Sequence, residues 1–505
     1  MTSSYARGGD ASVTRPVCRS RHALAGLTQT AAAPTVRPRG LTKVTVGREF
    51  PVPLPASLMS DIATAVGDRW SVAEAELAQH AQDESWHPPL PPDLVVYPAS
   101  TEEVASIVGA CHRAGVAVVP FGVGTSLEGG IGAERGGVCL DLSRMDRIVR
   151  LSIDDLDVTV EAGITRQALN DHINPQGLMF PVDPGANATI GGMTATGASG
   201  TTTVRYGAMP HNVLGLTVVL ADGRIIHTGG RARKTSAGYD LTRLFVGSEG
   251  TLGIITEITL RLYPIPEAIA AATCTFRSID DAVNVVIAAI QLGLPVARME
   301  LLDEPAIEAV NSFDDMSLSV APTVFFEFHG ITRAVQACAD EVRALVDNVG
   351  GAFEWATEAE DRSRLWHARH RAYWAMLAMR PGSKGWPTDV CVPISHLAEQ
   401  IREAKKDLVA SDLYAPLVGH VGDGNFHLCY ILDPDDPAEF ARAEAHYERM
   451  ITRALDVGGT CTGEHGIGAG KRDFLRREHP DGIDVMQAIK SALDPSTTLN
   501  PGKVV

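Results

Sequence analysis

The stretch Phe121-Gly122-Val123-Gly124-Thr125-Ser126-Leu127-Glu128-Gly129-Gly130 is a glycine-rich loop that follows an apolar segment at residues 116–120. That segment predicts a strand, and residues 94–97 and 101–114 before it predict a strand and a helix. At the end of such a βαβ unit, loop amides and the hydroxyls of Thr125 and Ser126 can approach phosphate oxygens. Leu127 occupies the third glycine position of a Rossmann fingerprint, so the loop is not of that type. Taken alone, it is better explained as a structural turn.

Two further segments of small residues follow in the same predicted α+β block. One runs from Pro181-Val182-Asp183-Pro184-Gly185-Ala186 through residues 191–201 to Arg205, and the other spans residues 245–255. Their small side chains leave room for a large flat ligand, and their hydroxyls and Arg205 offer donors to a pyrophosphate. Between them, residues 213–220 and 224–228 predict a β-hairpin. Three such segments in one block predict an extended cofactor instead of a lone phosphate.

After residue 266 the pattern changes to strands alternating with helices. The predicted strands lie at residues 271–276, 296–302, 323–329 and 386–392, and the predicted helices near residues 280–292, 333–349, 358–379 and 395–409. This order is typical of an antiparallel sheet backed by helices, which we interpret as a substrate cap. The aromatic and basic run at residues 364–374 is interpreted mostly as a packed and solvated helix face. Arg380, at the end of that helix, is the better candidate for binding a substrate carboxylate.

Two histidines flank a turn-forming tetrad in His420-Val-Gly-Asp-Gly-Asn425-Phe-His427. If residues 422–425 form a four-residue hairpin loop, His420 opposes His427 and both rings project from one face. Together with Glu464, they form a two-nitrogen, one-oxygen set that suits a divalent metal. His465 is then free to act as a general base beside the metal. On spacing alone, ordinary surface or core histidines remain an equal alternative.

Composition limits the classes of protein to which the chain can belong. Its 505 residues exceed what one core usually supports, so two or more domains are expected. The net charge of −17 argues against nucleic-acid binding and a polybasic membrane anchor, but allows docking of a basic redox partner. No apolar run is long enough to be a transmembrane segment. The eight cysteines include no CxxC pair, which predicts reduced thiols and excludes an iron–sulfur cluster of the usual spacing.

Residues 1–48 differ in kind from the rest of the chain. They are rich in arginine, serine, threonine and alanine and poor in acidic residues. This bias is typical of a mitochondrial transit peptide, although a disordered extension or a misplaced start codon would look the same. A cleaved segment predicts a mitochondrial enzyme. A bacterial protein with a misplaced start would be cytoplasmic or loosely membrane-associated.

Seven motifs, occurring in order over residues 54–505, carry a family resemblance. They begin at Pro120, Val182, Thr196, Gly247, His420, Gly463 and Asn500. Together they resemble the FAD-linked oxidases of the vanillyl-alcohol-oxidase superfamily, and among these the D-lactate dehydrogenases that use cytochrome c. One departure is Thr201-Thr202-Thr203-Val204, where the family pattern leads us to expect an Asn-Ala sequence. It affects the expected flavin contacts and not the expected fold.

The resemblance implies an α+β fold with a two-part FAD-binding domain of the PCMH type at residues 49–267. It also implies an antiparallel-sheet cap domain at residues 268–456, and a C-terminal segment at residues 457–505 that returns to the flavin. The implied cofactors are FAD and a divalent metal, manganese or zinc, bound by His420, His427 and Glu464. Non-covalent flavin is expected, because the first glycine loop contains no histidine or cysteine. The residues expected to contact FAD are Phe121, Gly122, Gly124, Thr125, Ser126, Gly130, Asp183, Pro184, Gly185, Ala186, Thr196, Gly197, Ala198, Gly200, Arg205, Glu249, Gly253, Ile255 and Asn500.

The implied reaction is oxidation of D-lactate to pyruvate by hydride transfer to flavin N5. In it His465 is the base, Arg380 binds the carboxylate and Asn425 lies nearby. Electrons then pass to cytochrome c or a quinone-linked carrier. Glycolate and other D-2-hydroxy acids remain alternative substrates. The absence of a cation from residues 385–389 favours a small or apolar tail over 2-hydroxyglutarate. From other classes, a flavin-free metal-dependent hydrolase lacks a Gly-x-Ser-x-Gly elbow here, and a flavin-free binding protein leaves the glycine-rich segments unexplained.

Overall fold

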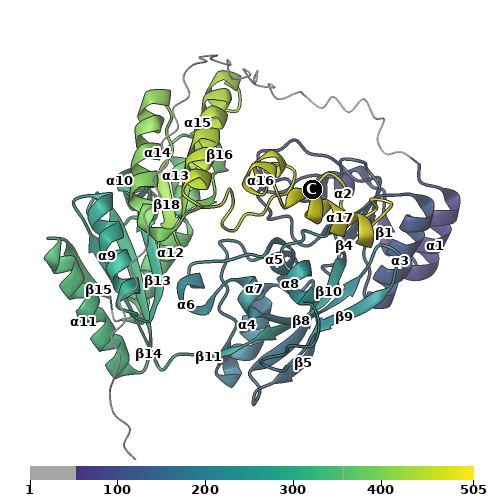
Figure 1. Ribbon diagram of the computed structural model, residues 1–505, viewed down its shortest axis with the longest axis horizontal. Coiled ribbons are helices and arrows are strands. Elements are labelled where there is room, and N and C mark those ends of the chain that lie inside the picture. Colours follow the sequence, from purple (N-terminus) through teal and green to yellow (C-terminus); the bar gives the residue numbers. More distant parts are fainter. Residues whose placement is uncertain (1–52, 357) are drawn as a thin grey trace, which may run out of the picture. The chain divides into compact units, whose positions relative to one another are not determined.

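The structure, a computed structural model, describes residues 53–356 and 358–505. The expectations for residues 1–48, a transit peptide or a disordered extension, lie outside the described residues. Residues 53–505 belong to one compact unit. Within it, the first domain and the cap domain have separate hydrophobic cores. Figure 1 shows the cap on the left and the first domain on the right, in purple to blue.

The first sheet of the first domain carries the glycine-rich loop. Its strand order is β1 (Trp70–Ser71), β2 (Leu94–Val96), β4 (Val138–Asp141) and β3 (Val118–Phe121). Strands β2, β4 and β3 are parallel, as the predicted βαβ unit requires. Helix α3 (Thr101–Ala114) connects β2 to β3, and α1 (Ala56–Val66) and α2 (Glu74–Gln79) precede them. The α3 N-terminus is capped by the Ser100 hydroxyl, which accepts a hydrogen bond from the Glu103 amide.

The second sheet is antiparallel and shares one core with the first. Its order is β5 (Ile148–Ser152), β6 (Asp157–Glu161), β10 (Ile254–Arg261), β8 (Val213–Val219) and β9 (Ile225–Gly229). The predicted hairpin is confirmed as β8 and β9. Strands β7 (Leu178–Met179) and β11 (Tyr263–Pro264) form a small ribbon. The connecting helices are α4 (Arg166–Ile173), the 3-10 turn Asn174–Gln176, α5 (Ile190–Thr196), α6 (Thr203–Tyr206), α7 (Met209–Asn212) and α8 (Leu241–Phe245).

The cap domain has the predicted antiparallel sheet with helices. The strand order is β15 (Ala352–Ala356), β12 (Ala268–Thr275), β14 (Thr323–Gly330), β13 (Val296–Leu302), β18 (Leu417–His420), β19 (Asn425–Leu432) and β16 (Lys384–Pro387), and β17 (Val390–Cys391) also pairs with β19. Its helices are α9 (Ile279–Gln291), α10 (Glu304–Asp314), α11 (Thr332–Asn348), α12 (Ala359–His370), α13 (Ala372–Ala378), α14 (Leu397–Ser411) and α15 (Pro437–Asp456), with a 3-10 turn at Ile394–His396. The single helix expected near residues 358–379 is two helices, α12 and α13, which meet at Arg371.

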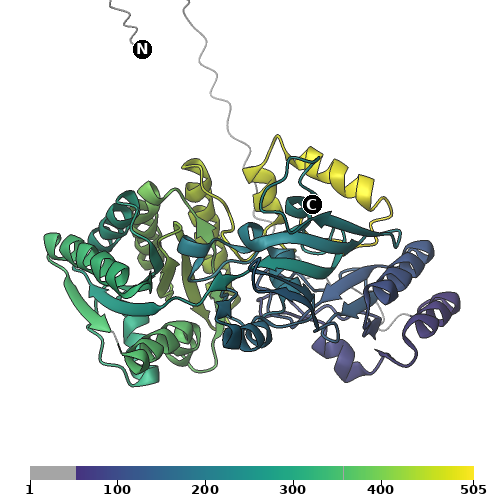
Figure 2. The ribbon, with the colours of Figure 1, turned by 90° about the horizontal axis from the view of Figure 1, so that it is seen from below.

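The C-terminal segment contacts both domains. Cys461, Ile467 and Leu475 belong to the cap core, whereas Leu499 belongs to the core of the first domain. Leu499 pairs with Val118 of β3, which bears the first glycine-rich loop. The segment contains α16 (Arg472–Glu478) and α17 (Ile483–Leu493), drawn in yellow in Figures 1 and 2. The tail therefore returns to the first domain, as expected.

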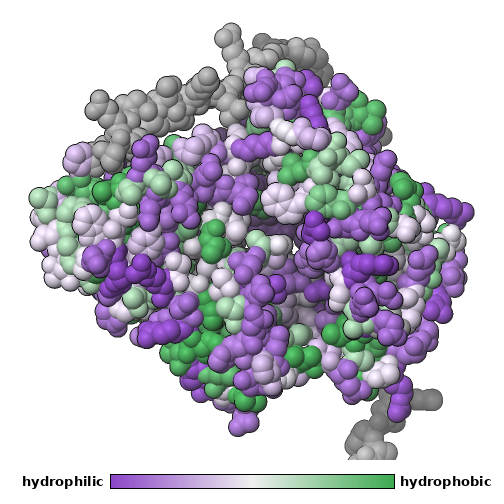
Figure 3. Space-filling view, turned by 180° about the vertical axis from the view of Figure 1, so that it is seen from behind, coloured by the Kyte–Doolittle hydropathy of each residue, from purple (hydrophilic) through white to green (hydrophobic). Residues whose placement is uncertain are grey.

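The surface gives no sign of a membrane-spanning element. Among the described residues, no helix is both long and apolar enough to cross a bilayer. The face in Figure 3 carries hydrophilic and hydrophobic residues in small alternating groups. Such a mixture is found on most globular proteins.

Candidate active site

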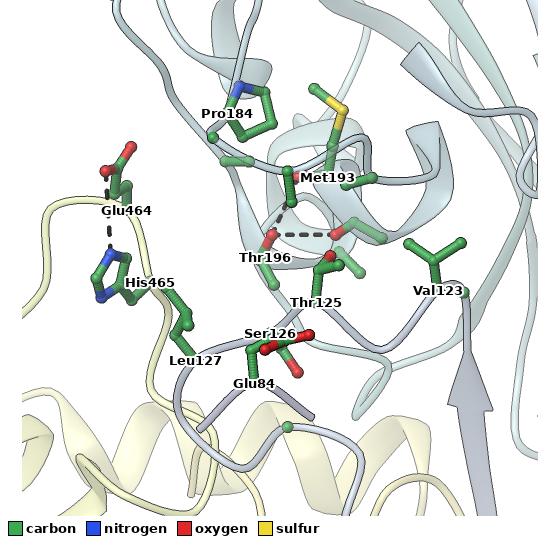
Figure 4. A pocket seen from close by; sticks show the side chains of 18 of the residues that line it. Glu84, Val123, Thr125, Ser126, Leu127, Pro184, Met193, Thr196, Glu464 and His465 are labelled. Atoms are coloured by element: carbon green, nitrogen blue, oxygen red, sulfur yellow. Dashed lines mark hydrogen bonds and ion pairs between the residues drawn. The ribbon is translucent and has the colours of Figure 1, made fainter. Parts of the chain in front are cut away.

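A cavity of about 530 Å³ is lined by both domains and the C-terminal segment. All three glycine-rich segments contribute to it, as the sequence predicted for an extended cofactor. Figure 4 shows Thr125 and Ser126 on the first loop, Met193 and Thr196 beyond them, and Glu464 and His465 on a separate segment. The expected flavin-contacting residues that line the cavity are Phe121, Gly122, Gly124, Thr125, Ser126, Gly130, Asp183, Pro184, Gly185, Ala186, Thr196, Ala198, Gly200, Glu249, Gly253, Ile255 and Asn500.

Two of the glycines are required by close packing behind the cavity wall. A Cβ atom on Gly122 would lie 2.4 Å from the Thr189 hydroxyl oxygen. At Gly200, a Cβ atom would lie 2.5 Å from the Asp183 carbonyl carbon. Because neither position can hold a side chain without moving its neighbour, the backbone itself forms the wall there. The glycines thus leave room for a ligand that lies against the main chain.

Asn500 and Glu249 hold the glycine-rich segments together. The Asn500 side-chain amide donates to the carbonyl oxygens of Gly130 at 3.1 Å and Glu249 at 2.8 Å. The Glu249 carboxylate accepts from the backbone amides of Ile467 at 2.7 Å and Gly468 at 2.8 Å. These bonds join the first and third glycine-rich segments to the C-terminal segment. Both side chains therefore shape the cavity, whatever contact they make with a ligand.

Two of the expected flavin-contacting residues do not line the cavity. Gly197 ends α5 with a φ of 71°, behind the wall that Ala198 and Gly200 form. The Arg205 guanidinium donates to the Pro295 carbonyl oxygen of the cap and is turned away from the cavity. Arg205 therefore does not face the cavity here, and its role as a pyrophosphate donor stays a prediction. The local pattern of small residues gave no information about the direction in which α6 points its side chains.

The three threonines that depart from the family pattern have clear partners. Thr201 donates to Asp183 Oδ2 at 2.7 Å, and Thr202 donates through its hydroxyl to the Pro181 carbonyl oxygen at 2.6 Å. Thr203 accepts from the Gly200 amide at 3.0 Å. Asp183 is also held by Arg298 of the cap, at 2.9 Å. The departure thus preserves a rigid loop that is tied to the cap.

His420 and His427 share one face of the cap sheet, but not in the expected register. His420 opposes Asn425, and His427 opposes Val418. The hairpin loop between β18 and β19 therefore consists of residues 421–424 and not of the expected residues 422–425. Because the register differs by two residues, an even number, both rings still project from the same side of the sheet.

His420, His427 and Glu464 form the group that the sequence predicted as metal ligands. One nitrogen or oxygen from each lies within 4.8 Å of the others. Glu464 Oε1 is 3.1 Å from His420 Nε2 and 3.2 Å from His427 Nε2. His420 Nδ1 donates to Glu300 at 2.8 Å, and His427 Nδ1 donates to the Thr388 carbonyl oxygen at 2.7 Å. Such partners fix the tautomer that points a bare Nε2 toward a metal, so the donor set fits a divalent cation.

The charges around these three residues also favour a cation. Burial lowers the pKa of His420, but Glu300 and Glu464 outweigh it and raise that pKa well above its ordinary value. Burial raises the pKa of Glu464, but His420 and His427 hold it well below its ordinary value. The Glu300 and Glu464 carboxylates thus favour positive charge at His420.

His465 lies beside this group without belonging to it. Its ring stacks on His427 with centroids 5.0 Å apart, and its Nε2 is 4.0 Å from Glu464 Oε1. Its Nδ1 is buried and has no hydrogen-bond partner. Burial lowers the pKa of His465 to about 4. The ring is therefore neutral near pH 7 and able to accept a proton at the edge of the cavity.

Asp389 is a buried carboxylate that sequence reasoning missed. It accepts from the Thr462 hydroxyl at 2.7 Å and from the backbone amides of Glu464 at 3.0 Å and His465 at 2.9 Å. Burial raises the pKa of Asp389, but His465 and Lys471 hold it well below its ordinary value. Asp389 thereby fixes the backbone of two candidate functional residues. These three partners lie more than 70 residues away, so no local motif indicates this role.

Asn425 serves this same carboxylate. Its side-chain amide donates to Asp389 Oδ1 at 2.8 Å and to the Val390 carbonyl oxygen at 2.7 Å. It is buried and does not line the cavity. Asn425 therefore holds Asp389 in place, and its expected position near the substrate stays a prediction.

Arg380 lies far from its expected position. Its guanidinium donates to Glu439 at 2.7 Å and to the Ile431 carbonyl oxygen at 3.0 Å, and its side chain is 41% exposed. It does not line the cavity. Its partners hold the Arg380 guanidinium outside the cavity lining, and the expectation that Arg380 binds the substrate carboxylate stays a prediction.

Arg369, on the preceding helix α12, does line the cavity. Among the described residues that line the cavity, it is the only arginine or lysine. Its Nη2 donates to Glu300 Oε2 at 2.5 Å, and its buried Nε has no hydrogen-bond partner. Glu300 binds His420 through its other oxygen. The buried Glu300 carboxylate therefore holds both the Arg369 guanidinium and His420, a candidate metal ligand. The signal was present, since Arg369 lies in the basic run interpreted as an ordinary helix face.

The comparisons with known proteins agree with this arrangement. A family model described as "FAD binding domain" matches residues 92–229, and one described as "FAD linked oxidases, C-terminal domain" matches residues 265–504. A zebrafish (Danio rerio) protein named "Probable D-lactate dehydrogenase, mitochondrial" is 51% identical, covering 89% of this chain and 91% of its own. An Arabidopsis thaliana protein named "D-lactate dehydrogenase [cytochrome], mitochondrial" is 44% identical, covering 93% and 84%.

A solved structure supports the fold. The chain superposes on p-cresol methylhydroxylase with a TM-score of 0.72 at 19% identity, covering 89% of this chain and 97% of that one. That likeness confirms the expected PCMH-type architecture of the two domains. The matches to the two family models and the identity to the two relatives extend over both domains. The chain therefore belongs to the FAD-linked oxidases.

Proposed function

We propose that the chain is an FAD-dependent dehydrogenase that oxidises D-lactate, or a closely related D-2-hydroxy acid, to the 2-oxo acid. One observation carries the proposal: a single cavity is lined by the glycine-rich segments, by Arg369, and by the group His420, His427, Glu464 and His465. The names of the zebrafish and Arabidopsis relatives support D-lactate as the substrate.

The glycine-rich walls would hold FAD, which supplies the acceptor for the Cα hydride of a 2-hydroxy acid. Loop residues 121–130 would approach FAD through their backbone at Gly122, and the second segment would do so at Gly200, because neither glycine presents a side chain. The first loop contains neither histidine nor cysteine, which supports non-covalent binding. Acid precipitation checks this: the flavin should appear in the supernatant, and flavin retained in the pellet would contradict it.

His420, His427 and Glu464 would hold manganese or zinc, which supplies a Lewis acid for the substrate oxygens. Glu300 and Thr388 orient the two imidazoles through their Nδ1 atoms. Asp389 orients Glu464 through its backbone amide. The ligands are thus fixed before a cation arrives, which reduces the cost of ordering them.

Arg369 binds the substrate carboxylate, and His465 takes the hydroxyl proton. Arg369 has donor groups left beyond its bond to Glu300, and a guanidinium fits a carboxylate with two parallel bonds. The Nε2 atom of His465 faces the candidate metal ligands, so we propose that Nε2 is the atom that accepts the hydroxyl proton. Burial keeps that ring neutral before reaction, as the lowered pKa of about 4 indicates.

The cap wall near Arg369 suits a short apolar tail. Tyr373, Met376, Val418 and Cys429 line the cavity there. No second arginine or lysine lines the cavity among the described residues, so a second carboxylate would have no counter-charge. We therefore infer that D-lactate and short apolar D-2-hydroxy acids are preferred over D-2-hydroxyglutarate.

Steady-state turnover with oxidised cytochrome c as acceptor tests this function. D-lactate should reduce cytochrome c, and D-2-hydroxyglutarate should give a kcat/KM lower by about 10²-fold, the effect of one unpaired buried charge. Equal rates with the two acids would contradict the inferred substrate tail. Reduction of a quinone analogue but not of cytochrome c would identify a quinone-linked carrier as the electron acceptor instead.

Arg369→Lys and Arg380→Lys form a matched pair that locates the carboxylate-binding residue. Arg369→Lys keeps the charge but loses the planar fork, so kcat/KM for D-lactate should fall by about 10- to 100-fold. Arg380→Lys should stay within about twofold of wild type, because an exposed ion pair contributes at most about 1 kcal/mol. Steady-state kinetics with D-lactate measure both. A loss confined to Arg380→Lys would return the role to Arg380.

The inference about the cellular compartment depends on residues 1–48. Their composition and the names of the relatives support a mitochondrial enzyme, and a cytoplasmic or loosely membrane-associated enzyme is the alternative if the segment is not cleaved. Residues 1–48 fused to a fluorescent protein and imaged in yeast distinguish the two. Accumulation in mitochondria supports the first, and diffuse fluorescence contradicts it.

A further inference from the structure

Ser199 joins the cofactor wall to the candidate metal ligands. Its hydroxyl donates to Glu464 Oε2 at 2.5 Å, across 265 residues of sequence. Ser199 stands between Ala198 and Gly200 in the second glycine-rich segment and itself lines the cavity. The two oxygens of Glu464 thus have different partners: Oε2 faces Ser199, and Oε1 faces His420 and His427. Among the described residues, Oε2 has no other hydrogen bond.

The backbone around Ser199 is fixed on both sides. The Ala198 amide donates to the Met193 carbonyl oxygen at 2.9 Å, and the Ala198 carbonyl oxygen accepts from the Met209 amide at 2.9 Å. The Gly200 amide donates to the Thr203 hydroxyl at 3.0 Å. Ser199 is therefore a rigid donor, and it sets the rotation of the Glu464 carboxylate.

We propose that Ser199 is a positioning residue that aims Glu464 Oε1 at the two imidazoles and thereby couples cofactor binding to metal binding. The inference rests on the metal centre of the proposed function. A ligand that lies against the wall at residues 198–200 fixes the Ser199 hydroxyl and, through it, the Glu464 carboxylate, so the two occupants stabilise each other. Such coupling is reciprocal: metal strengthens retention of FAD by the same factor by which FAD strengthens metal binding.

The expected size follows from the contact. Loss of a partner that orients a metal ligand typically weakens metal affinity by about 10- to 100-fold. Ser199→Ala should therefore weaken Mn²⁺ or Zn²⁺ binding by at least about 10-fold. It should also remove the coupling, so that FAD release no longer responds to the metal. Ser199→Thr keeps the hydroxyl and should restore both properties.

Ser248→Ala is the matched control. The Ser248 hydroxyl is also buried in a glycine-rich segment, but it has no hydrogen-bond partner. Removing it tests the loss of a serine hydroxyl without the loss of a contact to Glu464. Its metal affinity and its FAD release should equal those of the wild type.

The experiment uses the FAD-loaded enzyme and two readouts that do not require turnover. Metal affinity is measured by competition with a chelator, and FAD release by the rise of flavin fluorescence on dilution, with and without chelator. Chelator should accelerate FAD release from the wild type, Ser199→Thr and Ser248→Ala, but not from Ser199→Ala. If Ser199→Ala does not fold, Ser199→Cys replaces it, because its weak donor predicts the same loss.

The outcomes separate this inference from the proposed function. Metal affinity in Ser199→Ala within about twofold of wild type, while His427→Ala loses binding, would overturn the role of Ser199 and keep the metal centre. If the wild-type protein binds neither Mn²⁺ nor Zn²⁺, the metal centre and this inference are both overturned. The same follows if the wild type binds metal no more tightly than His427→Ala does.

Discussion

His465→Asn is expected to lower kcat for D-lactate by about 10²- to 10⁴-fold while the FAD content stays at the wild-type level. The reason is that His465 is the neutral imidazole beside the candidate metal ligands, with its pKa lowered to about 4 by burial. Asparagine cannot accept the hydroxyl proton, but its backbone amide can still donate to Asp389. Rapid-mixing measurement of flavin reduction separates this loss from changes in substrate binding.

His367→Asn is the matched control for this prediction. His367 is exposed on α12, outside the residues that line the cavity. The flavin of His367→Asn should be reduced at the wild-type rate. If the flavin of His465→Asn is also reduced at the wild-type rate, His465 is not the base. If the His465→Asn protein has lost FAD, the role of His465 is structural.

Removal of the metal is expected to abolish turnover without unfolding the protein. A Lewis acid at the substrate oxygens contributes several kcal/mol, so chelation should lower kcat/KM by about 10³-fold or more. His427→Ala should show the same loss, because it removes one of the three ligand groups. Manganese or zinc should restore the chelated wild type but not His427→Ala.

Circular dichroism provides the control for both forms. The first domain and the cap have separate hydrophobic cores, so we expect the fold to survive removal of the cation. Full activity after exhaustive chelation, with no metal found by elemental analysis, would contradict the metal centre. Restoration of His427→Ala by added metal would show that His427 is not a ligand.

The parts of the fold that were predictable depend on local patterns. The start of α3 follows from the cap at Ser100 and its acidic first turn, and the β8–β9 hairpin follows from Asp222-Gly223. The glycine-rich segments were predictable because small side chains mark a backbone wall in the sequence itself. Most of their residues line the cavity.

The residues that were misplaced depend on distant contacts. Arg369 lies in the basic run at residues 364–374 and Arg380 at the end of the single helix predicted there. The chain instead forms two helices that meet at Arg371, and only Arg369 lines the cavity. Arg205 points to the cap because Pro295 accepts its hydrogen bond. Asp389 and Glu300 have partners that are distant in sequence. Sequence spacing contains no information about such pairs.

The central claim is that this cavity transfers the Cα hydride of a D-2-hydroxy acid to bound FAD. An anaerobic absorbance spectrum of the metal-loaded protein, taken before and after D-lactate and with L-lactate as control, tests it most directly. Bleaching of an oxidised-flavin band by D-lactate alone is the expected result. A flavin band that neither D-lactate nor any other D-2-hydroxy acid bleaches would contradict the claim, although the fold would stand.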